Sequence, residues 1–184
     1  MKKLLCSLIF CLCGAAAFAS GKAPVPTVAQ IDLQRYMGRW YEIARLPNRF
    51  EKDCVGVFAD YTLLPEGKVR IVNSCHKKRL DAPMQASEGK AWAADRTNAK
   101  LKVRFFWPFY SHYWIMDIGP SYDYAVVGHP SRKYLWILSR KPSMDDKIYS
   151  ELTEKIKAAG YDLSEFQKTP QWQELEAEPG QAAF

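Results

Sequence analysis

The sequence has none of the compact motifs that carry common enzyme chemistry. It lacks a Gly-x-Ser-x-Gly nucleophile elbow, a glycine-rich phosphate loop, and a Cys/His cluster with zinc spacing. Its three histidines, His76, His112 and His129, are far apart in the chain. We therefore expect a protein that is not an enzyme, with no catalytic residue, no metal and no cofactor.

The chain also lacks a strong excess of charge and any internal repeat or interdomain linker. Its 26 basic and 20 acidic residues give a net charge of +6. Removal of the first nineteen residues would take away Lys2 and Lys3 and lower this excess to +4. A mildly basic surface of this kind is not typical of nucleic-acid binding, so we expect no nucleic-acid partner and one domain.

Long hydrophobic runs are absent apart from one near the start of the chain. Lys2 and Lys3 precede an apolar run from Leu4 to Phe18, and Ala17-Phe18-Ala19 has the small-x-small pattern of a cleavage site. This pattern predicts a secretory signal peptide over 1–19 and a soluble processed chain that is most simply periplasmic. An outer-membrane lipid anchor on Cys13 is the alternative, although Leu12 is larger than the residue such processing prefers.

Cysteine is scarce once this segment is removed. Only Cys54 and Cys75 remain, and an even number in an exported chain predicts a disulfide bond. On the chain-entropy model such a bond stabilises the fold by about 3 kcal/mol. Simple pairing about the turn at Pro65-Glu66-Gly67 places Cys75 opposite residue 57 or 58, so a bulge near Val55-Gly56 is required.

From Trp40 to Arg140 the sequence alternates short β-rich runs with turn residues, which is typical of an antiparallel barrel or sandwich. Hairpin signals such as Pro65-Glu66-Gly67 join neighbouring runs. The eight predicted strands are Trp40–Leu46, Val55–Leu64, Lys68–His76, Ser87–Ala94, Ala99–Phe106, His112–Ile118, Tyr122–Gly128 and Lys133–Arg140.

Helical patterns occur only at the two ends of this array. A capping-box pattern at Ser143 precedes Met144, Ile148, Leu152 and Ile156, which are spaced by four along one face, and Gly160 supplies a stop. This predicts an amphipathic helix that packs on the outside of the β structure. We also expect a single helical turn over residues 32–37, before the first strand.

Three separated motifs resemble those of the lipocalin family. Gly38 and Trp40 match its Gly-x-Trp on the first strand, Asp123 and Tyr124 match a second motif, and Arg140 matches the lone arginine of a third. The resemblance implies that Arg140 packs over the Trp40 ring at the closed end of the barrel. Counting strands of a meander independently places all of these residues at one end, so this cation–π contact, worth roughly 0.5–2 kcal/mol, is within reach.

Longer segments resemble bacterial lipocalins and their apolipoprotein D-like relatives, among them Trp40–Arg45, Ser87–Ala91, Phe106–Tyr110 and Tyr134–Arg140. The resemblance implies an all-β fold: an eight-stranded antiparallel up-and-down lipocalin barrel with a C-terminal amphipathic α-helix outside. It implies a carrier of a small hydrophobic ligand, such as a fatty acid or lysophospholipid, in the bacterial cell envelope. The expected organisation is a signal peptide (1–19), an N-terminal extension (20–31), a lipocalin domain (32–168) and a polar C-terminal tail (169–184).

An eight-stranded barrel is just wide enough to hold one small ligand. The predicted cavity residues are drawn from alternating positions on the strands, and a register slip of one residue would exchange the inner and outer faces. They are Ala44, Val57, Ala59, Tyr61, Val103, Phe105, Trp114, Met116, Val126 and Trp136.

Loops after the odd-numbered strands should surround the open end of the barrel. They carry aromatic and basic residues that suit the anionic head group of an acyl ligand, and that would equally suit peripheral contact with an anionic membrane. The predicted rim residues are Arg49, Lys77, Lys78, Arg79, Trp107, Phe109, Tyr110 and Arg132. Two other functions stay open: a protein-interaction module that uses the aromatic rim, and a metal- or haem-dependent enzyme that uses the three histidines. We expect a monomer or weak dimer.

Overall fold

The computed structural model describes residues 23–172, so the predicted signal peptide, Cys13 and the last residues of the predicted tail lie outside the described residues. Within the described residues, nine strands and two helices follow one another. They are α1 (Leu33–Tyr36), β1 (Gly38–Arg45), β2 (Cys54–Leu63), β3 (Val69–Lys77), β4 (Met84–Ala93), β5 (Lys100–Arg104), β6 (Ser111–Ile118), β7 (Tyr124–Gly128), β8 (Leu135–Ser139), α2 (Asp146–Ala158) and β9 (Gln167–Lys168).

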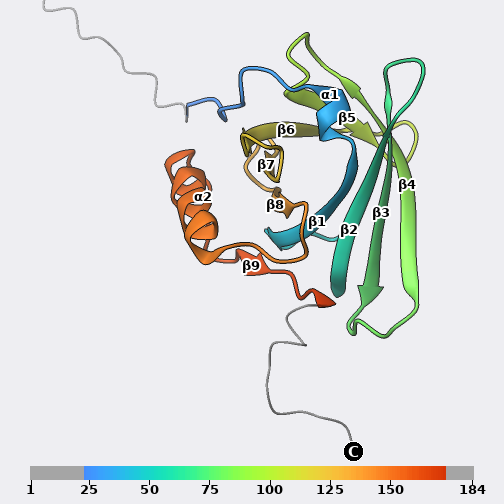
Figure 1. Cartoon of the computed structure of the whole chain (residues 1–184), viewed down its shortest axis with the longest axis vertical. Helices are drawn as coiled ribbons and strands as arrows, with labels where there is room; N and C mark the ends of the chain where they lie inside the picture. The colour runs from blue at the N-terminus through green and yellow to red at the C-terminus, as the bar shows by residue number, and fades with distance from the viewer. Residues whose placement is uncertain (1–22, 173–184) are drawn as a thin grey trace, which may run out of the picture.

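The first eight strands form a closed antiparallel barrel. Each strand pairs with the next along the chain, and β1 closes the ring by pairing with both β2 and β8 (Figure 1). All eight predicted strands are confirmed, with ends that differ by up to three residues. The two-residue strand β9, which pairs with β1, was not predicted.

Helix α2 packs against the outside of the barrel, as predicted (Figure 1). Its buried residues Leu152 and Ile156 lie in one hydrophobic cluster with Val126 of β7 and Ile137 of β8. The prediction that Ser143 begins the helix is corrected. The Asp145 carboxylate accepts hydrogen bonds from the Lys147 and Ile148 backbone N–H groups, so Asp145 is the N-cap.

The three predicted motifs meet at the end of the barrel covered by α1. The Arg140 guanidinium carbon lies 3.7 Å from the centre of the Trp40 ring. Arg140 also donates to the carbonyl oxygens of Arg35, Arg39 and Tyr122 at 2.8, 2.8 and 3.2 Å. The Trp40 ring is fully buried and its Nε1 donates to the Tyr36 carbonyl at 2.8 Å. This end is therefore closed by a fixed group of aromatic and cationic side chains.

The wall between β1 and β2 is completed by the end of the described chain. These strands pair only from Gly38 to Tyr41 and then separate. Residues 167–171, which we call the seam, fill the space beyond: Thr169 N–H donates to the Ile43 carbonyl, and Gly56 N–H donates to the Pro170 carbonyl. The Gln171 amide donates to the carbonyls of Glu42 and Val57, both at 2.9 Å.

Residues 169–171 belong to the seam and pack against the barrel, whereas a polar tail was predicted to begin at residue 169. Thr169 and Gln171 are buried, with 1% and 2% of their surface exposed. The Gln171 side chain donates to backbone carbonyls that the separated strands leave without partners, whereas the Thr169 hydroxyl donates to the Glu42 carboxylate and accepts from the Arg45 guanidinium. Packed structure also begins before residue 32, since Val25 and Ile31 are buried in the two hydrophobic clusters.

Candidate binding site

The barrel wall has a hydrophobic cluster on each face. The outer cluster contains residues of α2, whereas the inner cluster contains Trp40, Tyr61, Ile71, Leu101 and Val127 from strands around the ring. Of the predicted cavity residues, the inner cluster includes Ala59, Tyr61, Val103, Phe105 and Trp136. Their contact with a ligand stays a prediction.

Four predicted cavity residues face α2 instead, and this part of the prediction is corrected. Ala44, Trp114, Met116 and Val126 belong to the outer cluster. For Ala44 the cause is a register shift between Glu42 and Ala44. Side chains that alternate from the inward-facing Trp40 would place Ala44 inward, and the shift turns it to the outer face. Val57 is buried but belongs to neither cluster.

Several inward-facing side chains retain exposed surface. Ala59, Phe105, Tyr113 and Trp136 pack against the inner cluster, yet each is only partly buried. A filled barrel would bury them completely. The inner face therefore retains solvent-accessible surface that is apolar and aromatic.

Three tyrosines place hydroxyl groups among the apolar side chains of the inner cluster. The Tyr113 hydroxyl lies 2.8 Å from that of Tyr36 and 3.0 Å from that of Tyr61. Burial raises the pKa of Tyr61 to about 12 and raises the pKa values of Tyr36 and Tyr113 well above the ordinary value. All three phenols are therefore neutral hydrogen-bonding groups at physiological pH.

A buried ion pair lies on the inner side of β1 near the seam. The Arg45 guanidinium contacts the Glu42 carboxylate, donates to the Thr169 hydroxyl at 2.9 Å, and donates to the Glu51 and Cys54 carbonyls at 3.2 and 3.1 Å. Burial, and next the charge of Glu51, raise the pKa of Glu42 above its ordinary value, while Arg45 opposes the shift and favours the carboxylate. This network joins β1, the β1–β2 loop, β2 and the seam.

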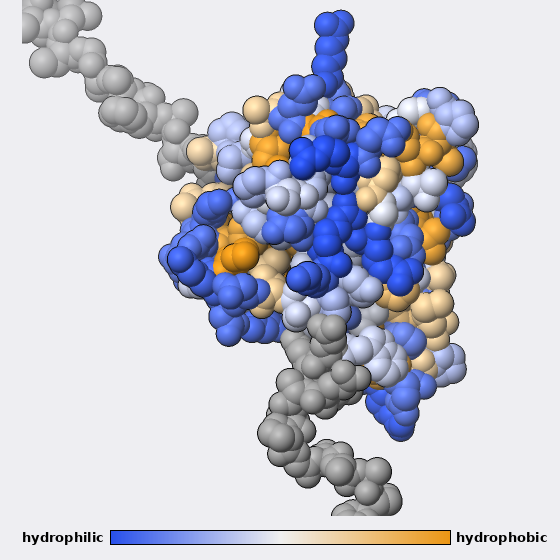
Figure 2. All heavy atoms as spheres, in the orientation of Figure 1, coloured by the Kyte–Doolittle hydropathy of each residue, from blue (hydrophilic) through white to orange (hydrophobic). Residues whose placement is uncertain are grey.

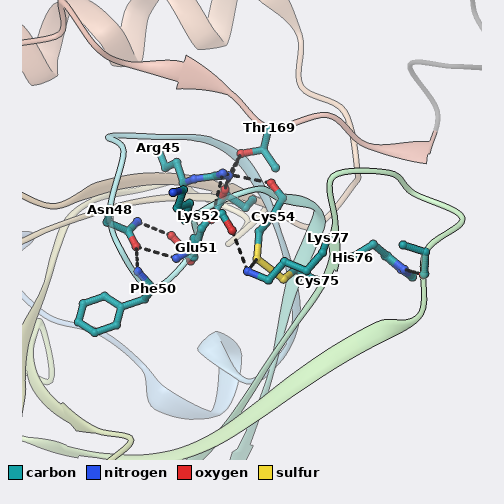
Figure 3. The surroundings of a disulfide bond; sticks show 12 residues. Arg45, Asn48, Phe50, Glu51, Lys52, Cys54, Cys75, His76, Lys77 and Thr169 are labelled. Atoms are coloured by element: carbon teal, nitrogen blue, oxygen red, sulfur yellow. Dashed lines mark hydrogen bonds and ion pairs between the residues drawn. A yellow bond between two sulfur atoms is a disulfide. The ribbon is translucent and has the colours of Figure 1, made fainter.

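The predicted Cys54–Cys75 disulfide is present beside this network (Figure 3). The two Cα atoms are 5.6 Å apart. The predicted bulge is confirmed by a register shift between Val55 and Phe58, where Gly56 adopts a φ of +58°. The Lys77 ammonium donates to the Lys52 carbonyl at 2.7 Å and lies 3.3 Å from the Cys54 sulfur, so the disulfide and this lysine hold the rim together.

The open rim also exposes large apolar side chains. Phe106, Trp107, Phe109 and Tyr110 of the β5–β6 loop are between 53% and 81% exposed. Phe50 of the β1–β2 loop is also exposed, and its ring points away from the hydrogen-bonded group beside it (Figure 3). The predicted aromatic rim is therefore exposed, and its role in binding stays a prediction.

Basic residues surround the rim, but several are engaged within the protein. Arg79 forms an ion pair with Asp81. Arg132 donates to the Ala159 carbonyl at the end of α2 and to the Ala23 carbonyl. Arg49 lies over the Phe50 ring, 4.9 Å from its centre. In Figure 2 the tip of the β3–β4 loop, at the lower right, is the blue of hydrophilic residues.

The structure brings two of the three histidines together. The rings of His112 and His129 are 5.5 Å apart, whereas the His76 ring contacts Trp172 and its Nδ1 lies 2.6 Å from the Ala82 carbonyl. Across residues 23–172, no group of three or more His, Cys, Asp or Glu side chains is arranged to hold a metal ion. No helix within the same residues is long and apolar enough to cross a bilayer.

Comparison with known proteins agrees with this geometry. Residues 31–171 match the family model described as a lipocalin-like domain. The chain is 41% identical to temperature-induced lipocalin-1 of Arabidopsis thaliana over 160 residues, which are 82% of this chain and 84% of that protein. It is 41% identical to the outer membrane lipoprotein Blc of Escherichia coli K12 (77% and 80% covered) and 32% identical to apolipoprotein D of Bos taurus (84% and 85% covered).

Solved structures show the same fold. Insecticyanin from the tobacco hornworm Manduca sexta superposes with a TM-score of 0.65 at 22% identity, with 80% of this chain and 84% of that chain covered. The cockroach allergen Per a 4 superposes with a TM-score of 0.63 at 21% identity, with 82% and 95% covered.

Proposed function

The chain belongs to the lipocalin family, whose members bind small hydrophobic ligands and are generally not enzymes, and we propose that it binds and carries a fatty acid or lysophospholipid inside its barrel. The inner face carries this proposal: Ala59, Phe105, Tyr113 and Trp136 are directed inward and yet accessible. An acyl chain buried against them would gain about 0.8 kcal/mol for each CH₂ group.

We further propose that the protein works in the bacterial cell envelope. The relative in Escherichia coli is named an outer membrane lipoprotein, which suggests that this chain is exported as well. A disulfide between Cys54 and Cys75 fits an oxidising compartment. A soluble periplasmic form follows from cleavage after residue 19, and a lipid anchor on Cys13 is the alternative form.

The open rim is proposed to make weak contact with an anionic membrane surface, where lipid can enter or leave. Trp107 and Phe109 present apolar rings to solvent, and cations accompany neighbouring rings: the Lys102 ammonium lies 4.6 Å from the centre of the Tyr110 ring. Aromatic rings beside lysine and arginine suit the interfacial region of a bilayer with anionic head groups.

Organic extraction of the purified protein tests the carrier function. We expect mass spectrometry of the extract to identify a monoacyl lipid in about equal molar amount to the protein, because the barrel has room for one small ligand. The delipidated protein should then bind a fluorescent fatty acid. Absence of both co-purified lipid and fluorescent fatty-acid binding would contradict the proposal and favour a protein-interaction module that uses the aromatic rim.

Sedimentation with phospholipid vesicles tests the membrane contact. Replacing Trp107 and Phe109 with alanine should reduce binding to phosphatidylglycerol-containing vesicles by about tenfold, because two interfacial rings are lost. The matched variant Trp107→Phe/Phe109→Trp keeps the aromatic area and should bind like the unmodified protein. Equal binding by the alanine variant and the unmodified protein would refute this contact.

A further inference from the structure

The inward side chains of β3 and β4 are apolar near the closed end of the barrel and polar near the open rim. In the half near the closed end, Val69 pairs with Ala91 and Ile71 pairs with Gly89, and all four are buried. In the half near the open rim the inward positions carry polar side chains. Asn73 pairs there with Ser87.

The pairing register establishes that these polar residues face inward. Side chains alternate along a strand, so Asn73 shares a face with Ile71, which belongs to the inner cluster. Ser87 and Gln85 share a face with Ala91 of the same cluster. The intervening Arg70 and Glu88 form an exposed ion pair on the outer face, which is consistent with this assignment.

These three inward polar side chains lack hydrogen-bonding partners among the described residues. Asn73, Gln85 and Ser87 make no side-chain hydrogen bond within residues 23–172. Asn73 is partly buried, while Gln85 and Ser87 are exposed although they face the barrel interior. A directly opposed pair such as Asn73 and Ser87 has Cβ atoms about 4.5–5.5 Å apart, so one small polar group can contact both.

The chemistry of this wall selects the kind of group that it can bind. Amides and hydroxyls both donate and accept hydrogen bonds but carry no charge. The inward positions from residue 73 to 75 and from 85 to 87 carry no acidic or basic side chain. The Phe105 ring lies against Gly89, where an added Cβ would be 2.8 Å from it, and Gly89 is the next inward position after Ser87 toward the closed end.

We propose that Asn73, Gln85 and Ser87 form a subsite for the hydroxyl-bearing glycerol unit of a monoacyl glycerolipid, with the acyl chain directed past Phe105 toward the closed end. This inference rests on the proposed carrier function and narrows the ligand class. A hydroxylated head group satisfies the three side chains, whereas a simple methyl ester offers them no donor.

Calorimetric titration of the delipidated protein with dodecanoylglycerol and methyl dodecanoate tests the subsite. These ligands share one acyl chain and are both uncharged, so the basic rim does not distinguish them. We expect the glycerol ester to bind about tenfold tighter, since a net hydrogen bond contributes about 0.5–1.5 kcal/mol and about 1.4 kcal/mol corresponds to tenfold in Kd. Equal affinities would overturn the subsite.

Variants of the inner and outer faces of β3 and β4 test whether the preference for the glycerol ester comes from the three polar side chains. The inner variant Asn73→Leu/Gln85→Leu/Ser87→Ala should lose about tenfold in affinity for the glycerol ester and less than about threefold for the methyl ester. The outer variant Arg70→Leu/Glu88→Leu, on the opposite face of the same strands, should change neither. Ser87→Ala alone, with its small side-chain change, replaces the inner variant if that variant does not fold.

The outcomes separate this inference from the function on which it depends. Equal losses for both esters in the inner variant would overturn the subsite while leaving the carrier function intact. Failure of the unmodified protein to bind either ester or dodecanoic acid would overturn the carrier function itself, and the subsite with it.

Discussion

Replacing Arg45 with alanine is expected to lower the free energy of unfolding by about 3–5 kcal/mol, because it leaves a buried partner without compensation. Arg45 and Glu42 have side chains that are only 6% and 3% exposed. The substitution also removes the donors to the Thr169 hydroxyl and to the carbonyls of Glu51 and Cys54. Urea unfolding with the disulfide intact, followed by tryptophan fluorescence, measures the change.

Two further variants test the reason for this loss. The double variant Glu42→Leu/Arg45→Met removes both charges and should recover part of the loss, since a buried pair is often replaceable by apolar residues. Arg39→Ala breaks a half-exposed ion pair with Asp60 and should cost less than about 1 kcal/mol. A cost for Arg45→Ala as small as that for Arg39→Ala would show that the network does not stabilise the wall.

Replacing Trp40 with alanine is expected to cost about 3–5 kcal/mol of stability while leaving ligand preference unchanged. The ring is fully buried, contacts the Tyr36 ring at a centroid distance of 5.0 Å, and supports Arg140. Its position at the closed end separates it from the open rim. Thermal or urea unfolding gives the stability, and competition between two fatty acids gives the preference.

Trp107→Ala is the matched control because the same ring type is 81% exposed there. Its effect on stability should stay within about 0.5 kcal/mol. A Trp40→Ala protein that keeps its stability but changes its ligand preference would contradict the assigned role of Trp40.

Strand order and the disulfide could be predicted from local signals in the sequence, while the resemblance to lipocalins identified the closed end. Turn residues such as Pro65-Glu66-Gly67 set the hairpins, and alternation along the meander then determines which end each motif occupies. Residues as distant as Trp40 and Arg140 could therefore be placed in contact. The bulge at Gly56 followed from the requirement that Cys54 and Cys75 align.

The inner face was harder to predict, for two physical reasons. Register shifts at Glu42/Ala44 and Ile115/Asp117 reverse the alternation without any signal in residue type. In β7 and β8 both faces are apolar because α2 covers the outer one, so Val126 and Val127 are equally hydrophobic although they belong to opposite clusters. The polar wall at Asn73 and Ser87 became recognisable only through the pairing of β3 with β4.

The seam joins residues that are very far apart in the chain. Gln171 bonds to Glu42 across 129 residues of chain, and Thr169 bonds to Glu42 across 127. A chain still being synthesised or exported can pair its hairpins, but it holds an unfinished wall between β1 and β2 until almost its last described residue arrives. Contacts over such separations form late and slowly. The gap between β1 and β2 can therefore be filled only after residues 167–171 have joined the chain, later than the pairing of β1 with β8 becomes possible.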